Sequence, residues 1–319
     1  AEQNLYPLGL REKDLVRHVC ISGMSGSGKT NMAYQFLRHF IKKEIPFIVF
    51  DWKKSFRPLL LIDEDIHYFT VGDKNVSNYF KININMPPDG VNPKEWIGIL
   101  CDMITESFGA SYGVHKLLTE TLDKAFKDFG VYENSGNYPT WLQIKDRLED
   151  RAADKTRGAN REKQWLTSAL RIAHSLTFGD FGEAINHKDA DAMSVEEVMG
   201  QKVIFELDSL STTEKKFFCE FLLTYVYKLE KSKPTSGEQT LKQEIVVDEA
   251  HNIFLKDRPH FIQETVTDMI YREVREYGVG LLCLDQHISK LSDTVVGNSA
   301  CNITFQQMLP SDVKTAAGV

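Results

Sequence analysis

The sequence lacks the features that mark membrane spans, disulfide frameworks and zinc sites. No apolar run approaches the roughly 18 residues that a membrane-spanning helix needs. The five cysteines are an odd number and never occur as Cys-x-x-Cys, so they predict buried, reduced thiols. No signal-like segment is present, and the expected location is cytoplasmic. Because the sequence starts at Ala1 instead of Met, we also expect it to be part of a longer protein.

An excess of positive charge is missing too. The 38 lysines and arginines are outnumbered by 45 aspartates and glutamates, which leaves a net charge of −7. This balance excludes nucleic-acid binding over the whole surface, but a local basic lining in a channel stays open. The 319 residues are 42% hydrophobic, enough for a sizeable core in one large or two ordinary domains.

The motif GMSGSGKT at residues 23–30 matches the phosphate-binding loop G-x-x-x-x-G-K-[ST] in full. A buried strand is predicted before it, over 16–22, and a helix with an apolar stripe after it, over 31–42. The glycines let backbone N–H groups approach a phosphate chain, which Lys29 would also reach, while Thr30 would bind Mg²⁺. We therefore predict ATP and Mg²⁺ as cofactors. The predicted nucleotide-binding residues are Gly23, Ser25, Gly26, Ser27, Gly28, Lys29, Thr30 and Asn31.

A second motif, EIVVDEAH, spans residues 244–251. Its apolar strand ends in two acids: Asp248 is predicted to bind Mg²⁺, and Glu249 to polarise the attacking water as general base. Two acids after an apolar run are a weak signal alone, but together with the phosphate-binding loop they predict ATP hydrolysis. The long separation of the two motifs predicts an inserted segment between them.

Two more buried strands, predicted over 45–50 and 280–286, lead to polar residues. Asp51 either orients the nucleotide or water at the carboxyl edge of the sheet, or only caps its strand. Gln286 either senses the γ-phosphate from a neighbouring strand or is a turn residue.

The remaining pattern predicts an α/β fold with a largely parallel sheet and an inserted helical subdomain. The core is predicted to comprise 1–91 and 201–319, with residues 1–15 leading along a sheet edge, and the insert to comprise 92–200. Helix signals in the insert begin at 92, 113, 140 and 161; Ser211 opens a further helix, and a polar helix is expected over 258–277. Other strands are expected over 68–71, 80–83, 202–207 and 302–305.

These segments resemble the HerA-like branch of the HerA/FtsK superfamily of hexameric DNA-translocating ATPases. The likeness rests, in the family's order, on RHVCISGMSGSGKT, FIVFDWKKS, KVIFELDSLSTTEKKFF, IVVDEAHN and REVREYGVGLLCLDQHISKLSD. It implies a RecA-like P-loop NTPase core, with catalytic roles for Lys29, Glu249 and Gln286. It further implies a homo-oligomer, expected to be a hexamer, that moves on or unwinds double-stranded DNA in a central channel, in DNA end processing with a nuclease partner.

The resemblance also implies a residue that acts across the subunit interface. Arg275 aligns with the arginine of the family's Gly-Arg-Lys, an arginine finger, although its neighbours here are Val274 and Glu276. Arg272 is the reserve candidate. The alternative is that both arginines lie on a solvated helix face.

The family's usual β-barrel before the phosphate-binding loop and its C-terminal brace are not visible in this sequence. Related ATPases of type IV secretion and conjugation share every motif above. The alternative function is therefore an ATPase scaffold of an antiviral defence, secretion or conjugation complex that activates or feeds an effector. Two basic clusters either line the DNA channel or form solvated patches: Lys53, Lys54 and Arg57, and Arg157, Arg161 and Lys163.

Overall fold

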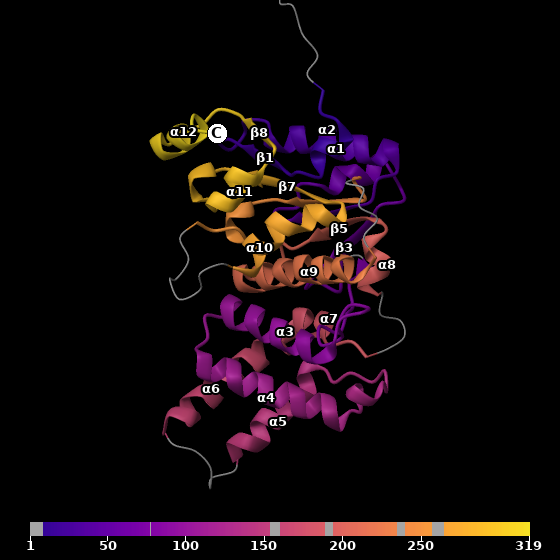
Figure 1. Ribbon diagram of the computed structural model, residues 1–319, viewed down its shortest axis with the longest axis vertical. Coiled ribbons are helices and arrows are strands. Elements are labelled where there is room, and N and C mark those ends of the chain that lie inside the picture. Colours follow the sequence, from indigo (N-terminus) through magenta and orange to yellow (C-terminus); the bar gives the residue numbers. More distant parts are fainter. Residues whose placement is uncertain (1–8, 77, 154–159, 189–193, 235–239, 257–264) are drawn as a thin grey trace, which may run out of the picture. The chain divides into compact units, whose positions relative to one another are not determined.

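The computed structural model describes residues 9–76, 78–153, 160–188, 194–234, 240–256 and 265–319 (Figure 1). The chain divides into two compact units. Unit 1 comprises residues 1–49 and 235–319, and unit 2 comprises residues 50–234. The division into a core and an insert at residues 92 and 200 stays a prediction.

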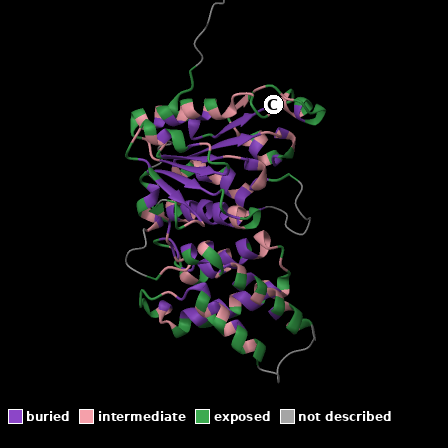
Figure 2. Cartoon of the chain, turned by 180° about the vertical axis from the view of Figure 1, so that it is seen from behind, coloured by how far each residue is buried: buried purple, intermediate pink, exposed green. Residues whose placement is uncertain are grey.

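Unit 1 contains four parallel strands, in the order β6-β7-β1-β8. They are β1 (Val19–Ser22), β6 (Gln243–Val247), β7 (Val279–Asp285) and β8 (Cys301–Thr304). Every residue of β1, β6 and β7 is buried, as their continuous apolar runs predict (Figure 2). Because all four strands run the same way, the loops that follow them lie at one edge of the sheet.

The helices of unit 1 connect these strands. They are α1 (Glu12–Leu15), α2 (Lys29–Lys43), α10 (Val266–Glu273), α11 (Asp293–Asn298) and α12 (Pro310–Ala316), with 3-10 turns η3 (Ala250–Asn252), η4 (Val274–Tyr277) and η5 (Ile288–Lys290). Within the predicted lead-in, residues 12–15 form a helical turn, at whose start the Arg11 backbone N–H and Nε donate to Asp14 Oδ2 at 3.3 and 2.7 Å. The predicted helix over 258–277 is present from Val266 onwards, while 257–264 lie outside the described residues.

Unit 2 holds three strands in the order β4-β3-β5, again parallel for the pairs β3–β4 and β3–β5. They are β3 (His67–Thr70), β4 (Asn78–Tyr79) and β5 (Lys202–Glu206). Strand β2 (Phe47–Asp51) covers the point where the sequence passes from unit 1 to unit 2.

The expected helical segment within 92–200 is present. It contains α3 (Pro93–Ser107), α4 (Tyr112–Asp128), η2 (Val131–Glu133), α5 (Trp141–Ala153), α6 (Asn160–Ser175), α7 (Gly179–Ile185) and α8 (Val195–Met199). Helices α3 to α6 pack on one another (Figure 1). The Asn92 side chain caps α3, accepting a bond from the Lys94 N–H at 2.9 Å, with Pro93 in the first turn as predicted.

Unit 2 also contains η1 (Arg57–Leu61) and the long helix α9 (Thr212–Ser232). Ser211 and Glu214 form the predicted capping box at the start of α9. The predicted strand over 80–83 is wrong. Its apolar residues Phe80 and Ile82 are buried, but the segment bonds to the end of α7 and the residues after it: the Ile82 N–H donates to the Ala184 carbonyl, and Asn83 forms an isolated antiparallel bridge with Asn186.

Of the helices in the described residues, none is long and apolar enough to span a membrane. The cysteines are free thiols, and four of the five are buried as predicted, whereas Cys301 is partly exposed. Burial raises the pKa of Cys20 and of Cys101 to about 12. These thiols are therefore neutral, apolar packing groups at physiological pH.

One buried acid in unit 1 has no evident compensation. Glu244 lies in β6 opposite Gly280 of β7, its side chain is fully buried, and neither carboxylate oxygen has a hydrogen-bond partner among the described residues. A Cβ at residue 280 would lie 2.2 Å from Glu244 Oε2, so glycine there makes room for the carboxyl group. Burial raises the pKa of Glu244 well above its ordinary value.

We expect Glu244→Met to stabilise the protein, because it replaces an uncompensated buried acid by an apolar chain of similar length. The folded-state pKa is raised, so the wild-type stability is greatest below the unfolded pKa of about 4.3 and falls as pH rises towards the folded pKa. The gain should reach roughly 1–3 kcal/mol at pH 8 and shrink at pH 5. Urea unfolding at both pH values measures it. The exposed Glu64→Met is the matched control, and an equal gain in both variants would contradict the prediction.

Candidate active site

The phosphate-binding loop connects the end of β1 to the start of α2. Gly26 and Gly28 take positive φ angles of 75° and 110°, as the motif predicts. The Lys29 ammonium group folds back over this loop and donates to the Gly23 and Met24 carbonyls, at 2.6 and 3.0 Å. A bound phosphate chain would compete with these two carbonyls for the ammonium group.

The segment after β8 packs against the same loop, which the sequence did not indicate. The Met24 N–H donates to the Gln306 carbonyl at 2.8 Å, and Gln307 Nε2 donates to Ser22 Oγ at 3.1 Å. A Cβ at Gly23 would lie 2.7 Å from the Cβ of Phe305, so the first glycine of the motif is required by this contact as well. Residues 305–307 therefore fix one side of the loop.

The second motif lies where β6 ends. Asp248 is partly exposed, and Glu249 is 9% exposed with a left-handed backbone, φ 50°. Such a conformation is costly for a residue other than glycine and is found preferentially at functional sites. Gln286, which follows β7, donates from Nε2 to Glu249 Oε1 at 2.6 Å. The structure thus brings the predicted general base and the predicted sensor into contact.

Two polar residues that the sequence did not single out complete this edge of the sheet. Asp285, the last residue of β7, is 1% exposed and accepts bonds at Oδ2 from the His251 backbone N–H (2.6 Å) and from His251 Nδ1 (2.9 Å). Its carbonyl accepts from the Gly23 N–H at 3.2 Å. The bond to Asp285 raises the pKa of His251, with smaller contributions from the charges of Asp285 and Glu249. The strand-end position of Asp285 is the sequence signal that could have found it.

The Mg²⁺ ligands predicted by the motifs suit that ion. Thr30 offers a hydroxyl oxygen and Asp248 a carboxylate oxygen, and both residues are partly exposed. Among the described residues no cluster of three or more His, Cys, Asp or Glu is placed to hold a metal. Mg²⁺ commonly takes only one or two protein ligands beside phosphate oxygens and water, so the donor set fits it.

Arg275 lies at the opposite end of β7 from Gln286. It belongs to η4, which precedes the seven-residue strand, whereas Gln286 follows the strand. At about 3.3 Å per residue, the strand alone separates the two by roughly 20 Å. Arg275 is partly exposed. Because the length of β7 separates it from Gln286, Arg275 cannot act on a nucleotide bound beside Gln286 of its own chain.

His18 supports the segment that carries Arg275. This histidine is fully buried; its Nε2 donates to the Tyr271 carbonyl at 2.6 Å, and its Nδ1 accepts from the Leu281 N–H at 3.0 Å. Burial, with a smaller contribution from the nearby Arg275 charge, lowers the pKa of His18 to about 4, although the bond to the Tyr271 carbonyl opposes the effect. The neutral imidazole thus fixes both ends of the segment between α10 and β7.

The other predicted candidates lie in unit 2. Asp51 is fully buried, and its carboxylate accepts from the backbone N–H groups of Lys53, Ser55 and Phe56 at 2.8–3.1 Å. Burial raises the pKa of Asp51, although these three bonds oppose the effect. This geometry supports the interpretation that Asp51 caps its strand.

Ion pairs occupy part of the first basic cluster. Lys54 pairs with Asp208 at 3.0 Å, and Arg57 donates from Nε and Nη2 to the buried Glu206 at 2.6 and 2.7 Å. In the second cluster, Arg161 and Lys163 are exposed on α6, while Arg157 lies outside the described residues. Neither arrangement identifies a DNA-binding lining.

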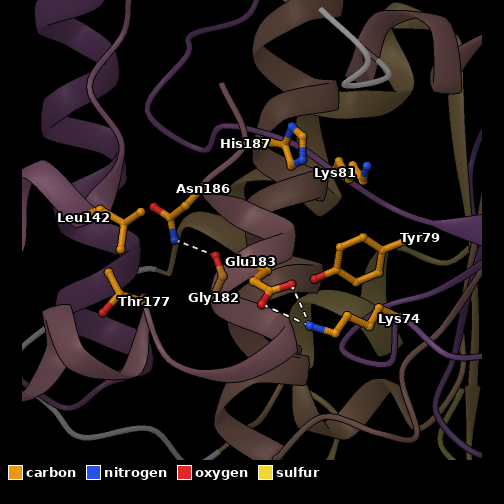
Figure 3. A pocket seen from close by; sticks show the side chains of 9 residues that line it. All are labelled: Lys74, Tyr79, Lys81, Leu142, Thr177, Gly182, Glu183, Asn186 and His187. Carbon is orange, nitrogen blue, oxygen red and sulfur yellow. Dashed lines mark hydrogen bonds and ion pairs between the residues drawn. The ribbon is translucent and has the colours of Figure 1, made fainter. Parts of the chain in front are cut away.

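Unit 2 also contains a cavity of about 540 Å³ that includes none of the residues predicted from the motifs (Figure 3). Lys74, on its wall, pairs with both carboxylate oxygens of Glu183 at 3.1 Å. Asn186 Nδ2 donates to the carbonyls of Leu176 and Gly182, each at 2.7 Å. Much of the polar lining is therefore already satisfied.

Comparison with solved structures supports the fold. VirB4 of Thermoanaerobacter pseudethanolicus superposes with a TM-score of 0.68 at 13% identity, covering 95% of this chain and 81% of that one. The plasmid coupling protein TrwB in complex with ADP and Mg²⁺ superposes with a TM-score of 0.56 at 14% identity, covering 96% and 69%. The predicted α/β P-loop NTPase fold is confirmed.

Sequence comparison identifies relatives. The DNA double-strand break repair helicase HerA of Sulfolobus acidocaldarius is 22% identical over 317 residues, covering 96% of this chain and 58% of the relative. That of Saccharolobus solfataricus is 20% identical, covering 96% and 57%. The chain thus spans less than two thirds of the length of these relatives.

A family model described as "Helicase HerA, central domain" matches residues 3–279, which include the phosphate-binding loop, Asp248, Glu249 and Arg275. Gln286 and the segment after β8 lie beyond the match. Because the match covers most of the sequence, this chain belongs to the family of the HerA central domain.

Proposed function

We propose that the chain is an ATPase motor that hydrolyses ATP between neighbouring copies of a homo-oligomeric ring and acts on double-stranded DNA. The observation that carries the proposal is the 2.6 Å contact between Gln286 and Glu249, at the sheet edge where the phosphate-binding loop also lies. Glu249 alone would polarise water, but when it is hydrogen-bonded to the Gln286 amide, which follows the neighbouring strand, it can also respond to the γ-phosphate.

Each group has a distinct task in this mechanism. Lys29 moves from its two carbonyls to the β- and γ-phosphates, and the backbone N–H groups of residues 23–30 surround the phosphate chain. Thr30 and Asp248 hold Mg²⁺, which when bound neutralises charge on the phosphate oxygens. Glu249 orients the attacking water and accepts its proton, while Gln286 fixes the carboxylate of Glu249.

The position of Arg275 supports a ring. Because it lies at the far end of β7 from its own site, Arg275 would serve as an arginine finger only for a neighbouring copy. We propose a hexamer, with Arg275 of each chain directed at the nucleotide of the next. Arg272, exposed on α10, is the alternative finger.

The names of the relatives support a DNA substrate, since they are DNA double-strand break repair helicases. We propose that the ring passes duplex DNA through its channel and works in end processing with a nuclease, as a cytoplasmic enzyme. The net charge of −7 confines DNA contact to a local surface inside the ring. Neutralising each basic cluster in turn and measuring the salt dependence of DNA binding shows whether that cluster contacts DNA or is a solvated patch.

The test measures ATP hydrolysis by the wild type and by Lys29→Ala, with and without duplex DNA. We expect hydrolysis that duplex DNA stimulates, and loss of nucleotide binding in the variant, because Lys29 supplies the loop's point charge for the phosphates. Lys43→Ala, at the exposed end of the same helix, is the control and should bind ATP normally. Wild-type protein that binds no ATP would overturn the proposal.

The comparison of hydrolysis with and without duplex DNA separates the motor function from the scaffold function. Hydrolysis that is indifferent to DNA but rises with an added effector protein would favour the scaffold of a defence, secretion or conjugation complex. Light scattering of the same samples gives the particle mass, and a monomer in the presence of both nucleotide and DNA would contradict the ring.

A further inference from the structure

His251 lies between two carboxylates of the proposed active site. Its Nδ1 is 2.9 Å from Asp285 Oδ2 and 3.7 Å from Glu249 Oε2. The other oxygen of Glu249, Oε1, accepts the bond from Gln286. The Glu249 carboxylate is thus flanked on one oxygen by an amide and on the other by an imidazole.

Asp285 determines how the imidazole is oriented. Its Oδ2 accepts from both the backbone N–H and Nδ1 of His251, and its Oδ1 accepts from the His287 N–H at 2.7 Å. An acceptor opposite Nδ1 requires the hydrogen to be on that nitrogen. Two bonds from one residue to one carboxylate oxygen leave the ring little freedom to rotate. The side chain of His251 is 22% exposed, which is consistent with this restricted position.

Asp285 also links the His251 imidazole to the phosphate-binding loop. The Asp285 carbonyl accepts from the Gly23 N–H, and Gln286 follows Asp285 directly in the chain. The turn that carries Glu249 has a left-handed backbone, so its conformation depends on surrounding contacts. The Asn252 side chain also supports that turn, donating to the Glu249 carbonyl at 3.0 Å.

We propose that His251, held by Asp285, is a positioning residue for Glu249 and keeps its carboxylate aligned with the attacking water. The inference rests on the proposed function, because it assigns His251 a part in the same hydrolysis. His251 acts through Glu249 and does not itself exchange a proton with the substrate.

The test compares His251→Ala with His251→Asn. The Asn side chain can place an amide N–H where Nδ1 lies, whereas Ala removes the donor. We expect Ala to lower kcat by about 10²-fold, the usual scale for a misaligned catalytic group, with nucleotide affinity within about twofold of wild type. Asn should recover at least about tenfold of the loss. Affinity is measured with a fluorescent, non-hydrolysable ATP analogue.

A double-variant cycle separates positioning from a general effect on the fold. If His251 acts only through Glu249, adding His251→Ala to Glu249→Gln should lower the residual kcat by less than about twofold. Losses of kcat and nucleotide affinity in parallel, without recovery by Asn, would overturn the positioning role. So would an unchanged kcat in His251→Ala.

A measurement that needs no turnover distinguishes failure of this inference from failure of the proposed function. In protein labelled with ¹⁵N-histidine, the Nδ1 signal of His251 should be that of a protonated nitrogen and should change in Asp285→Asn. A signal of unprotonated Nδ1 would overturn the pair, whether or not the chain hydrolyses ATP. Absence of wild-type hydrolysis with the expected Nδ1 signal would overturn the function instead and, with it, the catalytic purpose assigned to the pair.

Discussion

Glu249→Gln is expected to bind ATP with wild-type affinity and to lose about 10³-fold in kcat, within the usual range for a general base. The substitution removes the basic oxygen but keeps an amide oxygen that can accept the bond from Gln286, so the turn should be preserved. Asp248 is unchanged, and the Mg²⁺ site is therefore expected to remain. Steady-state phosphate release measures turnover, and titration with a fluorescent ATP analogue measures binding.

The control for this variant is Glu64→Gln, which removes an exposed carboxylate in unit 2 and should leave both quantities unchanged. If Glu249→Gln retains turnover, Glu249 is not the base. If it loses nucleotide affinity together with turnover, its carboxylate contributes to binding and the division of tasks between Asp248 and Glu249 is wrong.

Arg275→Ala is expected to leave nucleotide affinity nearly intact and to lower kcat by about 10³-fold or more, the precedent for arginine fingers. The reason is that a finger stabilises charge that develops mainly in the transition state. The position of Arg275 at the far end of β7 excludes the alternative that it binds the nucleotide of its own chain. Phosphate release and analogue binding are again the two measurements.

Arg272→Ala is the matched comparison, since Arg272 lies on the preceding helix and is the other arginine of this segment. A loss of kcat confined to Arg272→Ala would identify Arg272 as the arginine finger. Normal turnover in both variants would place both side chains on a solvated face, as the alternative interpretation of the sequence allows.

The sequence predicted the strand ends of unit 1 well, for a simple reason. Three continuous apolar runs, each ending in a polar or glycine-rich segment, correspond to β1, β6 and β7. Because parallel strands converge at their carboxyl ends, placing Lys29, Glu249 and Gln286 at one edge required no knowledge of side-chain packing.

The contacts that complete the site join segments that are far apart in the sequence, and no local sequence pattern predicts such contacts. Phe305 and Gln307 contact a loop more than 270 residues earlier in the sequence, through the pairing of β8 with β1. The bonds between His251 and Asp285 depend on the left-handed turn at Glu249, which a glutamate would not be expected to adopt.

Two segments differ from a simple reading of the sequence pattern, each for its own reason. The apolar alternation at 80–83 correctly indicated burial, but helix α7, distant in sequence, supplies the partner groups that a strand would otherwise provide. At 12–15, the Arg11–Asp14 pair stabilises a helical turn too short to show a periodic pattern.

We propose that hydrolysis takes place between neighbouring copies of the chain. Mixing Glu249→Gln with Arg275→Ala tests it most directly, because neither variant alone has an interface with both an intact base and an intact finger. In a mixed ring, an Arg275→Ala chain supplies Glu249 and its Glu249→Gln neighbour supplies Arg275. We expect ATPase activity to return in the mixture, in proportion to such interfaces, whereas either variant alone should keep only its low residual activity. A mixture that forms mixed rings by light scattering and mass analysis, yet stays as inactive as its components, would contradict it.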